Sequence, residues 1–423
     1  MKSSSNHLHQ VISVCLLILL SLTNCSPPEA EIPEHLNELE NLVVIQPNSE
    51  PASSIEFIRD AVIDDRNATK TWFKDITSGG FPFGGAGWIA GVEVDDSGRI
   101  YVGNRPEKTI QVFDSTGSYL TNIGGEGNGP GEFKGITEIR IQSNQLYAFD
   151  FLQFRTTFFS LDSLKVDDVK NAYLSRSPDV EELTGWLYNG NKLIDDERFL
   201  VRYMDEYANA NVGTPRYNLD KSRPGRYYIV DREGKVVSDM LFELKSQKII
   251  TADVGGRHLW NMAPVTFLNQ PLVSISDDGH IVSANSEESL VKMYAPNGDS
   301  LRAFYIPIEK KRIIREELIK LYGEGDEENE NLLIHAELPE KWPALGDIIL
   351  DDENRLWVST IPDSEDLSYD WWVLQDTGEF LATFRWPGNR SIEKIKDSYL
   401  YARETEETTG LQTIVKYRVE ITQ

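Results

Sequence analysis

The sequence is poor in cysteine: of its 423 residues only Cys15 and Cys25 are cysteine, and both lie near the N-terminus. The rest of the chain therefore has no disulfide framework and no zinc site built on thiolates. Basic residues are also in deficit, since 42 Lys and Arg stand against 68 Asp and Glu, for a formal net charge of −26. A surface of this sign repels nucleic acid at long range, so we expect no nucleic-acid partner.

A continuous apolar run, VISVCLLILLSL, occupies residues 11–22. It is shorter than the roughly 20 residues that a bilayer span needs and has the length of a signal-peptide core. The run ends in Leu-Thr-Asn-Cys, which resembles the lipobox of bacterial lipoproteins, although Asn24 stands where Gly, Ala or Ser is usual. The resemblance implies a signal peptide over residues 1–24 and lipid on the sulfur of Cys25. A plain secretory signal is the alternative.

The segment after Cys25, residues 26–54, is dominated by Pro, Glu, Ser and Asn. This composition is typical of an extended, self-repelling tether. We therefore assign residues 25–68 to a lipidated cysteine with its flexible tether, and residues 69–423 to the folded domain.

The body of the chain repeats a pattern of four short strands. In residues 92–125 apolar strands alternate with the turns Asp-Asp-Ser-Gly and Asp-Ser-Thr-Gly. Asp and Ser bond the local backbone in such turns, and Gly supplies positive φ. The same pattern recurs five times, in residues 136–169, 193–244, 275–305, 348–386 and 392–421.

Six repeats of four strands predict a six-bladed β-propeller with four-stranded antiparallel blades. The last repeat has only three clear strands. We expect an N-terminal strand, residues 70–76 (KTWFKDI), to supply the fourth and close the ring. Residues 310–323 have helical spacing and precede the acidic stretch GEGDEENEN, read as a loop. Residues 308–345 are thus predicted to be a helical and acidic insertion before blade five.

A glycine-rich stretch, GGEGNGPGEF, covers residues 124–133. It contains neither G-x-G-x-x-G nor a Gly-Lys-Ser/Thr motif, and no predicted helix follows it, so a phosphate-binding loop is disfavoured. It lies between the outer strand of one repeat and the inner strand of the next. We interpret it as a structural corner between two blades.

The glycine corner and the hairpins DDSGRIYV and DDENRLWV resemble those of six-bladed propeller lipoproteins of environmental and gut bacteria, which are relatives of NHL-repeat and TolB-like propellers. The similarity covers roughly residues 70–420. It implies the fold, export and a lipid anchor in the cell envelope, in the bacterial outer membrane. It implies no established reaction.

Catalytic motifs are scarce. The three histidines of the body, His258, His280 and His335, are too scattered to suggest a metal centre, and G-x-S-x-G and H-E-x-x-H are absent. Most Asp-Asp pairs fall in hairpins, where turn chemistry accounts for them. We predict no cofactor. The oxygen ligands that Ca²⁺ prefers are nevertheless abundant, so composition leaves a calcium site open.

In a propeller the second strand of each repeat ends at the mouth of the central funnel, where ligands bind. Polar side chains that donate hydrogen bonds or offer flat stacking faces gather there. The candidate ligand-binding residues are Asn104, Arg105, Asp150, Arg155, Arg202, Tyr203, Asn285 and Arg403.

We therefore expect a monomeric, exported, lipid-anchored propeller that binds a polar ligand or an envelope protein. The alternative is a hydrolase or lyase assisted by Ca²⁺ or Zn²⁺, with its site on the propeller axis.

Overall fold

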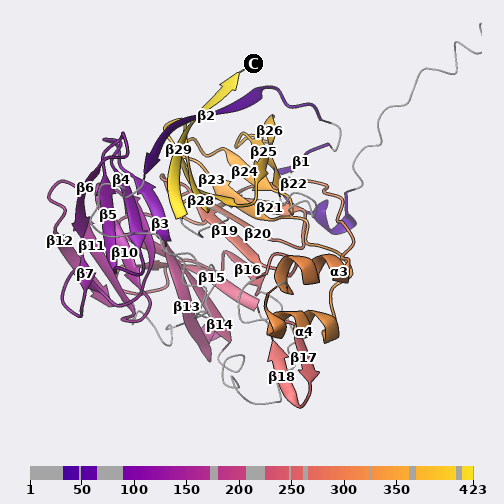
Figure 1. The fold of residues 1–423 in the computed structure, drawn as a ribbon. Helices are drawn as coiled ribbons and strands as arrows, with labels where there is room; N and C mark the ends of the chain where they lie inside the picture. The colour runs from indigo at the N-terminus through magenta and orange to yellow at the C-terminus, as the bar shows by residue number, and fades with distance from the viewer. Residues whose placement is uncertain are drawn as a thin grey trace, which may run out of the picture.

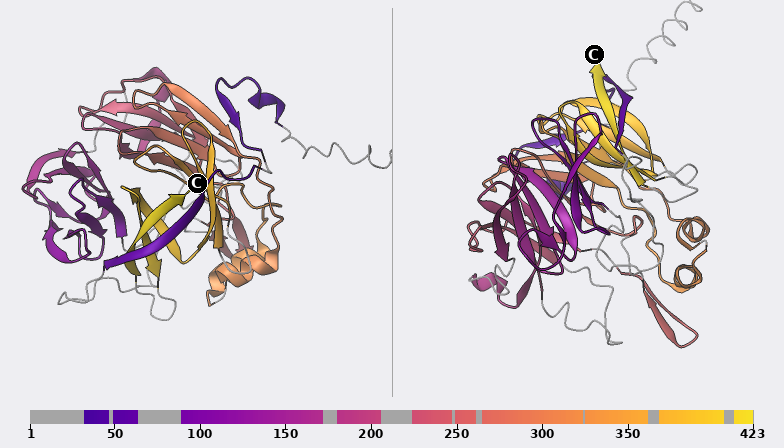
Figure 2. Two further views of the ribbon diagram at one scale, coloured as in Figure 1. Left: turned by 90° about the horizontal axis from the view of Figure 1, so that it is seen from above. Right: turned by 60° about the vertical axis from the view of Figure 1, so that its left-hand side comes forward.

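The computed structural model describes residues 32–46, 49–63, 89–171, 180–205, 224–246, 249–260, 265–323, 325–361, 368–405 and 412–422. Within these ranges the chain forms six antiparallel sheets of four strands, arranged as blades around an axis (Figures 1 and 2). A fifth strand is added to blade four. The chain is therefore a six-bladed β-propeller, as the repeats predicted.

The first three blades follow one another along the chain. Their strands are β3 (Ile89–Val94), β4 (Ile100–Asn104), β5 (Thr109–Phe113) and β6 (Tyr119–Ile123) in blade one; β9 (Ile136–Gln142), β10 (Gln145–Asp150), β11 (Arg155–Ser160) and β12 (Val166–Asn171) in blade two; and β13 (Trp186–Leu193), β14 (Arg198–Asp205), β15 (Pro224–Asp231) and β16 (Phe242–Lys245) in blade three. Blade three thus begins seven residues before the predicted position, 193.

The other three blades complete the ring. Their strands are β19 (Pro271–Ile275), β20 (Ile281–Asn285), β21 (Leu290–Tyr294) and β22 (Ser300–Tyr305) in blade four; β23 (Asp347–Leu350), β24 (Leu356–Ser359), β25 (Ser368–Leu374) and β26 (Phe380–Pro387) in blade five; and β27 (Arg390–Lys396), β28 (Tyr399–Thr405), β29 (Gln412–Thr422) and β2 (Ser54–Ile63) in blade six.

The predicted aspartate turns form the hairpins. The buried Asp95 carboxylate accepts hydrogen bonds from the backbone N–H of Ser97 at 2.9 Å and of Arg99 at 3.0 Å. Asp351 does the same in blade five, with the N–H groups two and four residues later. Each carboxylate thereby satisfies turn donors that would otherwise be left unpaired, which is why Asp recurs at this position.

Hydrophobic clusters fill the spaces between neighbouring blades. Ile100 and Val102 of β4, for example, pack with Tyr401 and Ile414 of blade six. A lone four-stranded sheet would expose both faces, whereas the ring buries them. Each fully buried aliphatic or aromatic side chain contributes about 1.5–3 kcal/mol.

Strand β2 closes the ring. It pairs antiparallel with β29 from Ser54 opposite Thr422 to Ile63 opposite Ile414 (Figure 1). Closure by an N-terminal strand was predicted, but the strand is β2 and not residues 70–76, which lie outside the described residues. The segment SIEFIRDAVI alternates polar and apolar residues over its first four positions, the pattern of a half-buried strand. Its polar flanks obscured that pattern.

The expected tether also contains two further elements. A 3₁₀ turn, η1 (Glu34–Leu36), is followed by β1 (Leu42–Val44), which pairs in parallel with the outermost strand of blade four, β22. Part of the segment assigned to the tether, residues 25–68, is therefore folded onto the propeller.

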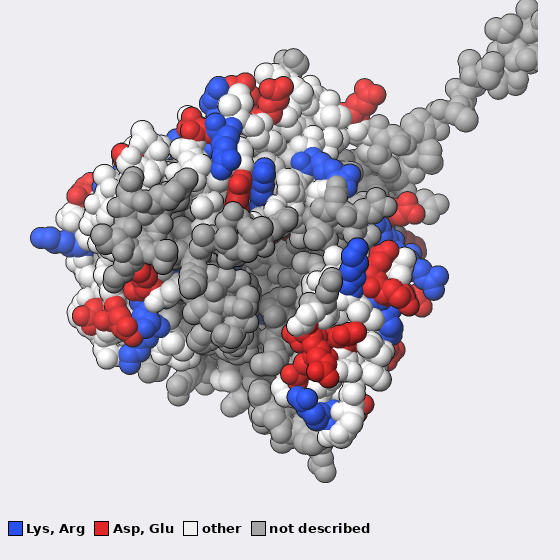
Figure 3. Space-filling model, viewed as in Figure 1, with Lys and Arg blue, Asp and Glu red and all other residues white. Residues whose placement is uncertain are grey.

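The insertion before blade five is helical but differs in detail. Its first helix is short, α3 (Arg315–Leu318) continued by the π-turn η3 (Ile319–Gly323). The acidic stretch is not a loop but helix α4 (Glu327–His335), because the Asp326 carboxylate caps it by accepting from the N–H groups of Glu328 and Asn329. Acidic side chains gather over α4 (Figure 3).

A β-hairpin absent from the sequence prediction joins this insertion. Strands β17 (Thr251–Val254) and β18 (Arg257–Trp260) pack with α3 and α4 around a small apolar core. Three short elements remain: η2 (Glu181–Leu183) and the paired strands β7 (Gly125–Glu126) and β8 (Glu132–Phe133). Across the described ranges, no helix is long and apolar enough to cross a bilayer.

Candidate functional site at the second-strand face

The ring has two distinct faces. The second strand of every blade ends on one, which we call the second-strand face; hairpins join first and second strands on the other, the hairpin face. On the second-strand face, the beginning of each blade's inner strand pairs with the end of its second strand, as Asp347 pairs with Ser359. All eight predicted ligand-binding residues come from strands or loops near this face. Six of them contact nearby loops or the core, and the other two, Arg105 and Arg403, take part in a group of charged residues from several blades.

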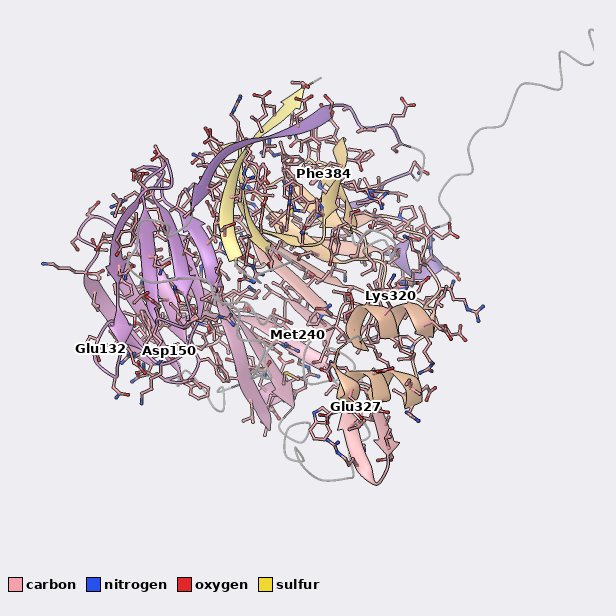
Figure 4. The ribbon with its side chains drawn as sticks, viewed as in Figure 1. Glu132, Asp150, Met240, Lys320, Glu327 and Phe384 are labelled. Atoms are coloured by element: carbon pink, nitrogen blue, oxygen red, sulfur yellow. The ribbon has the colours of Figure 1, made fainter. Side chains whose placement is uncertain are left out.

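Asp150 and Arg155 hold the glycine corner. The Asp150 carboxylate, 1 % exposed, accepts from the N–H groups of Lys134 at 2.6 Å and Gly135 at 3.2 Å. The Arg155 guanidinium donates to the carbonyls of Asn128 and Gly129, each at 2.9 Å. Asp150 and Glu132 come close together at this corner (Figure 4). These side chains fix a loop.

Two glycines of the corner are required by space and by backbone angle. Gly124 has φ +78°, and a Cβ there would collide with the ring of Phe133. Gly131 has φ +77°, and a Cβ there would collide with Val166. The structural interpretation of the stretch is confirmed, and the glycines need no ligand to account for them.

Four other candidates are buried or hydrogen-bonded within the fold, although the side-chain oxygen of Asn285 has no hydrogen-bond partner among the described residues. Asn104 is fully buried, and its side-chain oxygen accepts from the N–H of Glu107 at 3.0 Å. Asn285 is buried at the equivalent end of β20. Tyr203 lies in the core between blades two and three. Arg202 donates to the hydroxyl of Ser246 at 2.7 Å.

The last two candidates, Arg105 and Arg403, meet at a glutamate that the sequence analysis missed. Arg403 pairs with Glu393 of β27, with Nε 2.9 Å from Oε1. Arg105 donates to the carbonyl of Thr137 at 3.1 Å. Burial and the neighbouring Arg403 lower the pKa of Arg105, while Glu393 acts in the opposite direction. Burial raises the pKa of Glu393 in spite of Arg403.

A second carboxylate, Asp347, begins the inner strand of blade five beside this group. It is solvent-exposed, but protein surrounds it on its other sides. Desolvation by that protein raises the pKa of Asp347 to about 6; the nearby Glu393 raises it further, and the Ile348 N–H and Lys192 lower it. Within the described part of the chain, the one hydrogen bond to this carboxylate comes from the backbone N–H of Ile348, at 2.8 Å.

Lys192 extends the group to blades two and three. Its Nζ lies 3.9 Å from the carboxylate of Glu138, and it is near enough to Asp347 to lower the pKa of that group. We call the connected set the axial charge group. Its members are Arg105, Glu138, Lys192, Asp347, Glu393 and Arg403, from every blade except the fourth.

The sequence carried a sign of this group. Glu138, Lys192, Asp347 and Glu393 all lie on first strands, each directly beside an apolar residue. In a propeller the first strand is innermost, so the side chains on one side of it face the axis. The search of second-strand ends could not find it.

Ion pairs bind the blades together at the hairpin face. Lys394 Nζ lies 3.0 Å from Glu93 and 2.5 Å from Asp277, and Lys396 Nζ lies 2.9 Å from Asp96. We call these five residues the cross-axis cluster, because they join blades one, four and six. Burial opposes ionisation of Asp277, but Lys394 and Lys396 hold its pKa below the usual value.

Asp277 therefore does more than shape a turn. In this hairpin the hydroxyl of Ser276 takes the place of the turn aspartate, accepting from the N–H of His280 at 3.0 Å. Asp277 is left to reach blade six. The prediction that turn chemistry accounts for the Asp-Asp pairs is wrong at this position.

The three histidines of the body do not converge. His258 contacts Asp253, His280 contacts Asp278 and His335 contacts the carbonyl of Asn331, each at 2.9 Å. Among the residues that the structure describes, no three His, Cys, Asp or Glu side chains are grouped so as to hold a metal ion.

Comparison with known proteins agrees with the fold. A family model described as a 6-bladed beta-propeller matches residues 86–240, which include blades one and two and most of blade three. No curated protein matches the sequence.

Solved structures of low identity match over most of the chain. A protein named as a putative exported protein, from Bacteroides fragilis, is 11 % identical, with 90 % of this chain and 100 % of that chain covered and a TM-score of 0.45. A member of the DUF4221 family from Bacteroides vulgatus is 10 % identical, with 88 % and 99 % covered and a TM-score of 0.47. A calcium-binding protein, regucalcin, from Agrobacterium tumefaciens is 10 % identical, with 90 % and 97 % covered and a TM-score of 0.37.

Proposed function

We propose that this propeller is exported, anchored by lipid at Cys25, and binds a polar ligand or an envelope protein through the axial charge group. The observation that carries the binding proposal is Asp347. Most of the charges around it are paired with one another, as Glu393 is with Arg403, whereas its own carboxylate is open to solvent and accepts only a backbone N–H among the described residues. Such a carboxylate is available to a ligand.

The surroundings of Asp347 indicate the chemistry of the ligand. A carboxylate with its pKa near 6 is ionised at neutral pH and favours a cationic group, such as an amine. Arg105 and Arg403 lie beside Glu393, the neighbour of Asp347, and can donate to a hydroxyl or a carboxylate of the same molecule. The net charge of −26 favours cationic over anionic ligands at a distance. We infer a polar ligand that carries an amine.

We expect glucosamine and ethanolamine to bind more tightly than glucose and ethylene glycol, their neutral counterparts. Asp347→Asn should weaken amine binding about tenfold, which is the loss of about 1.4 kcal/mol. Affinity of the parent for ethanolamine, whose amine stays protonated up to pH 8, should rise with pH and level off above about 6, because only ionised Asp347 attracts the amine. Isothermal titration calorimetry between pH 5 and 8 measures both effects.

Asp376→Asn is the matched control, since Asp376 is exposed in a turn on the hairpin face of the same blade. Equal amine affinity for the Asp347 and Asp376 variants would refute the assignment. Metal-dependent turnover of lactones, phosphoesters or glycosides that is lost in Asp347→Asn would instead favour the hydrolase.

The anchor is supported by the apolar run before Leu-Thr-Asn-Cys and by the lack of any later cysteine. Cys25 lies outside the described residues. We expect the full chain, expressed in a bacterium, to sediment with membranes and Cys25→Ser to be recovered largely as soluble protein, because the acyl chains give the stable attachment. Immunoblots of the two fractions measure this. Identical soluble fractionation of both proteins would exclude the anchor.

A further inference from the structure

The N-terminal segment forms a belt around the outside of the ring. The belt, residues 34–63 (of which 47–48 lie outside the described residues), adds β1 to the edge of blade four. It next passes blade five, where the N–H groups of Ala52 and Ser53 donate to the carbonyls of Phe380 and Leu381 at 2.9 and 2.8 Å. It ends as β2, the outermost strand of blade six (Figure 2).

Side chains fasten the belt where it begins. Leu36, 4 % exposed, packs against Leu290 and Ala303 of blade four. Ile45 joins the core between blades four and five. Gly378 of blade five lies so close to Val43 that a Cβ on the glycine would collide with that side chain. The first residues of the belt are therefore part of the folded domain and fix the point from which the chain runs back toward Cys25.

The distance from that point to the proposed anchor is short. Nine residue steps separate Cys25 from Glu34, and nine extended residues reach at most about 30 Å. A random coil of nine residues spans about 17 Å on average. A compact domain of this size has a radius of gyration near 20 Å and hence a diameter of about 50 Å. A lipid on Cys25 can therefore lie near the rim of blade four but not near the opposite rim.

We propose that the outer rim of blade four faces the lipid bilayer. This proposal rests on the anchor proposed above and adds an orientation to it. With one rim toward the membrane, the ring axis runs along the membrane surface, and the second-strand face opens sideways into the surrounding compartment. The short segment between Cys25 and Glu34 sets this orientation. Attraction to the lipid surface does not, because a chain with a net charge of −26 has no general attraction to anionic head groups.

The rim positions that test the orientation are two exposed leucines near the outer edges of opposite blades. Leu301 is on β22 of blade four and 36 % exposed; Leu120 is on β6 of blade one, across the ring, and 50 % exposed. A fluorescent amino acid is placed at one position or the other in residues 25–423. Each purified protein is then coupled through the Cys25 thiol to phosphatidylcholine vesicles that contain a maleimide lipid and an acceptor dye on the head groups.

We expect energy transfer to the head-group dye to be at least twofold greater from position 301 than from position 120. Equal transfer from the two positions, or greater transfer from 120, would overturn the orientation. Because the coupling is chemical, the result does not depend on lipid modification in cells. Failure of the anchor and failure of the orientation are thus separate outcomes.

A longer tether provides the control. Inserting about 30 Gly and Ser residues between Ser26 and Pro27 leaves every described contact in place but frees the domain to rotate. The difference between the two positions should then largely disappear. Persistence of the full difference would mean that a surface affinity, not the tether, orients the domain, and would overturn the proposal. Equal melting temperatures confirm that the labelled proteins are folded.

Discussion

Removal of residues 26–63 will prevent the propeller from forming a stable ring, whereas removal of 26–53 will leave it folded but less stable. The first deletion takes away β2 and exposes the whole edge of β29. It also removes Phe57, whose ring lies 4.7 Å from that of Phe384 and 5.1 Å from that of Trp386. Loss of a packed aromatic alone costs about 3–5 kcal/mol, and a domain has only about 5–15 kcal/mol in total.

The shorter deletion removes η1 and β1 but keeps β2. Leu36 and Ile45 are then lost from the surface of blade four, and their combined burial is worth about 3–6 kcal/mol at most. Circular dichroism during heating distinguishes the two outcomes: a lowered but cooperative melt for the shorter deletion, and no cooperative melt or an aggregated protein for the longer one. Equal melting temperatures of both deletions would show that β2 does not close the ring.

Lys394→Met should be the most damaging single substitution at the hairpin face. It leaves the buried Glu93 without the lysine beside it and takes one of two lysines from Asp277. Breaking a buried pair costs about 3–5 kcal/mol; partial exposure reduces our expectation to about 2–4 kcal/mol. Lys320→Met, an exposed lysine on the insertion (Figure 4), is the control and should change stability by less than about 0.5 kcal/mol.

The loss at Lys394 should depend on pH in a definite direction. Burial raises the pKa of Glu93, and Lys394 is the strongest influence that lowers it. Without the lysine, the folded state favours protonated Glu93 more strongly, so the penalty is small in acid and grows as pH rises through the raised pKa. Melting temperatures at pH 5 and pH 8 measure this. Adding Glu93→Gln should restore at least half of the loss at pH 8; no recovery would contradict the pairing.

The sequence predicted features whose partners are close along the chain. The Asp95 turn bonds to residues two and four positions later, so its signature is local and the hairpins could be recognised. The glycine corner was recognised for the same reason. The prediction placed the closing strand wrongly because β2 pairs with β29, more than 350 residues away. No local feature of Ser54–Ile63 identifies that partner.

The candidate site was predicted only in part, for a geometric reason. Arg105 and Arg403 do take part in the axial charge group, whereas Asp150 and Arg155 bond to the nearby loop instead. Whether a polar side chain at a strand end faces the axis or its own loop depends on side-chain direction, which repeat alignment does not reveal. Asp347 and Glu393 become neighbours only because their blades are adjacent in the ring.

Closure by β2 makes the order of synthesis matter. A ribosome produces β2 early and its partner β29 last, and at about 5–20 residues per second the interval of roughly 350 residues lasts about 20–70 s. During that time β2 has no partner strand, and an unpaired strand is prone to aggregate. The pairing of β2 with β29 also makes stability depend on whether synthesis has reached β29. A product that stops before β29 leaves blade six open and remains a substrate for proteases, so only a chain carrying both strands is retained as folded protein.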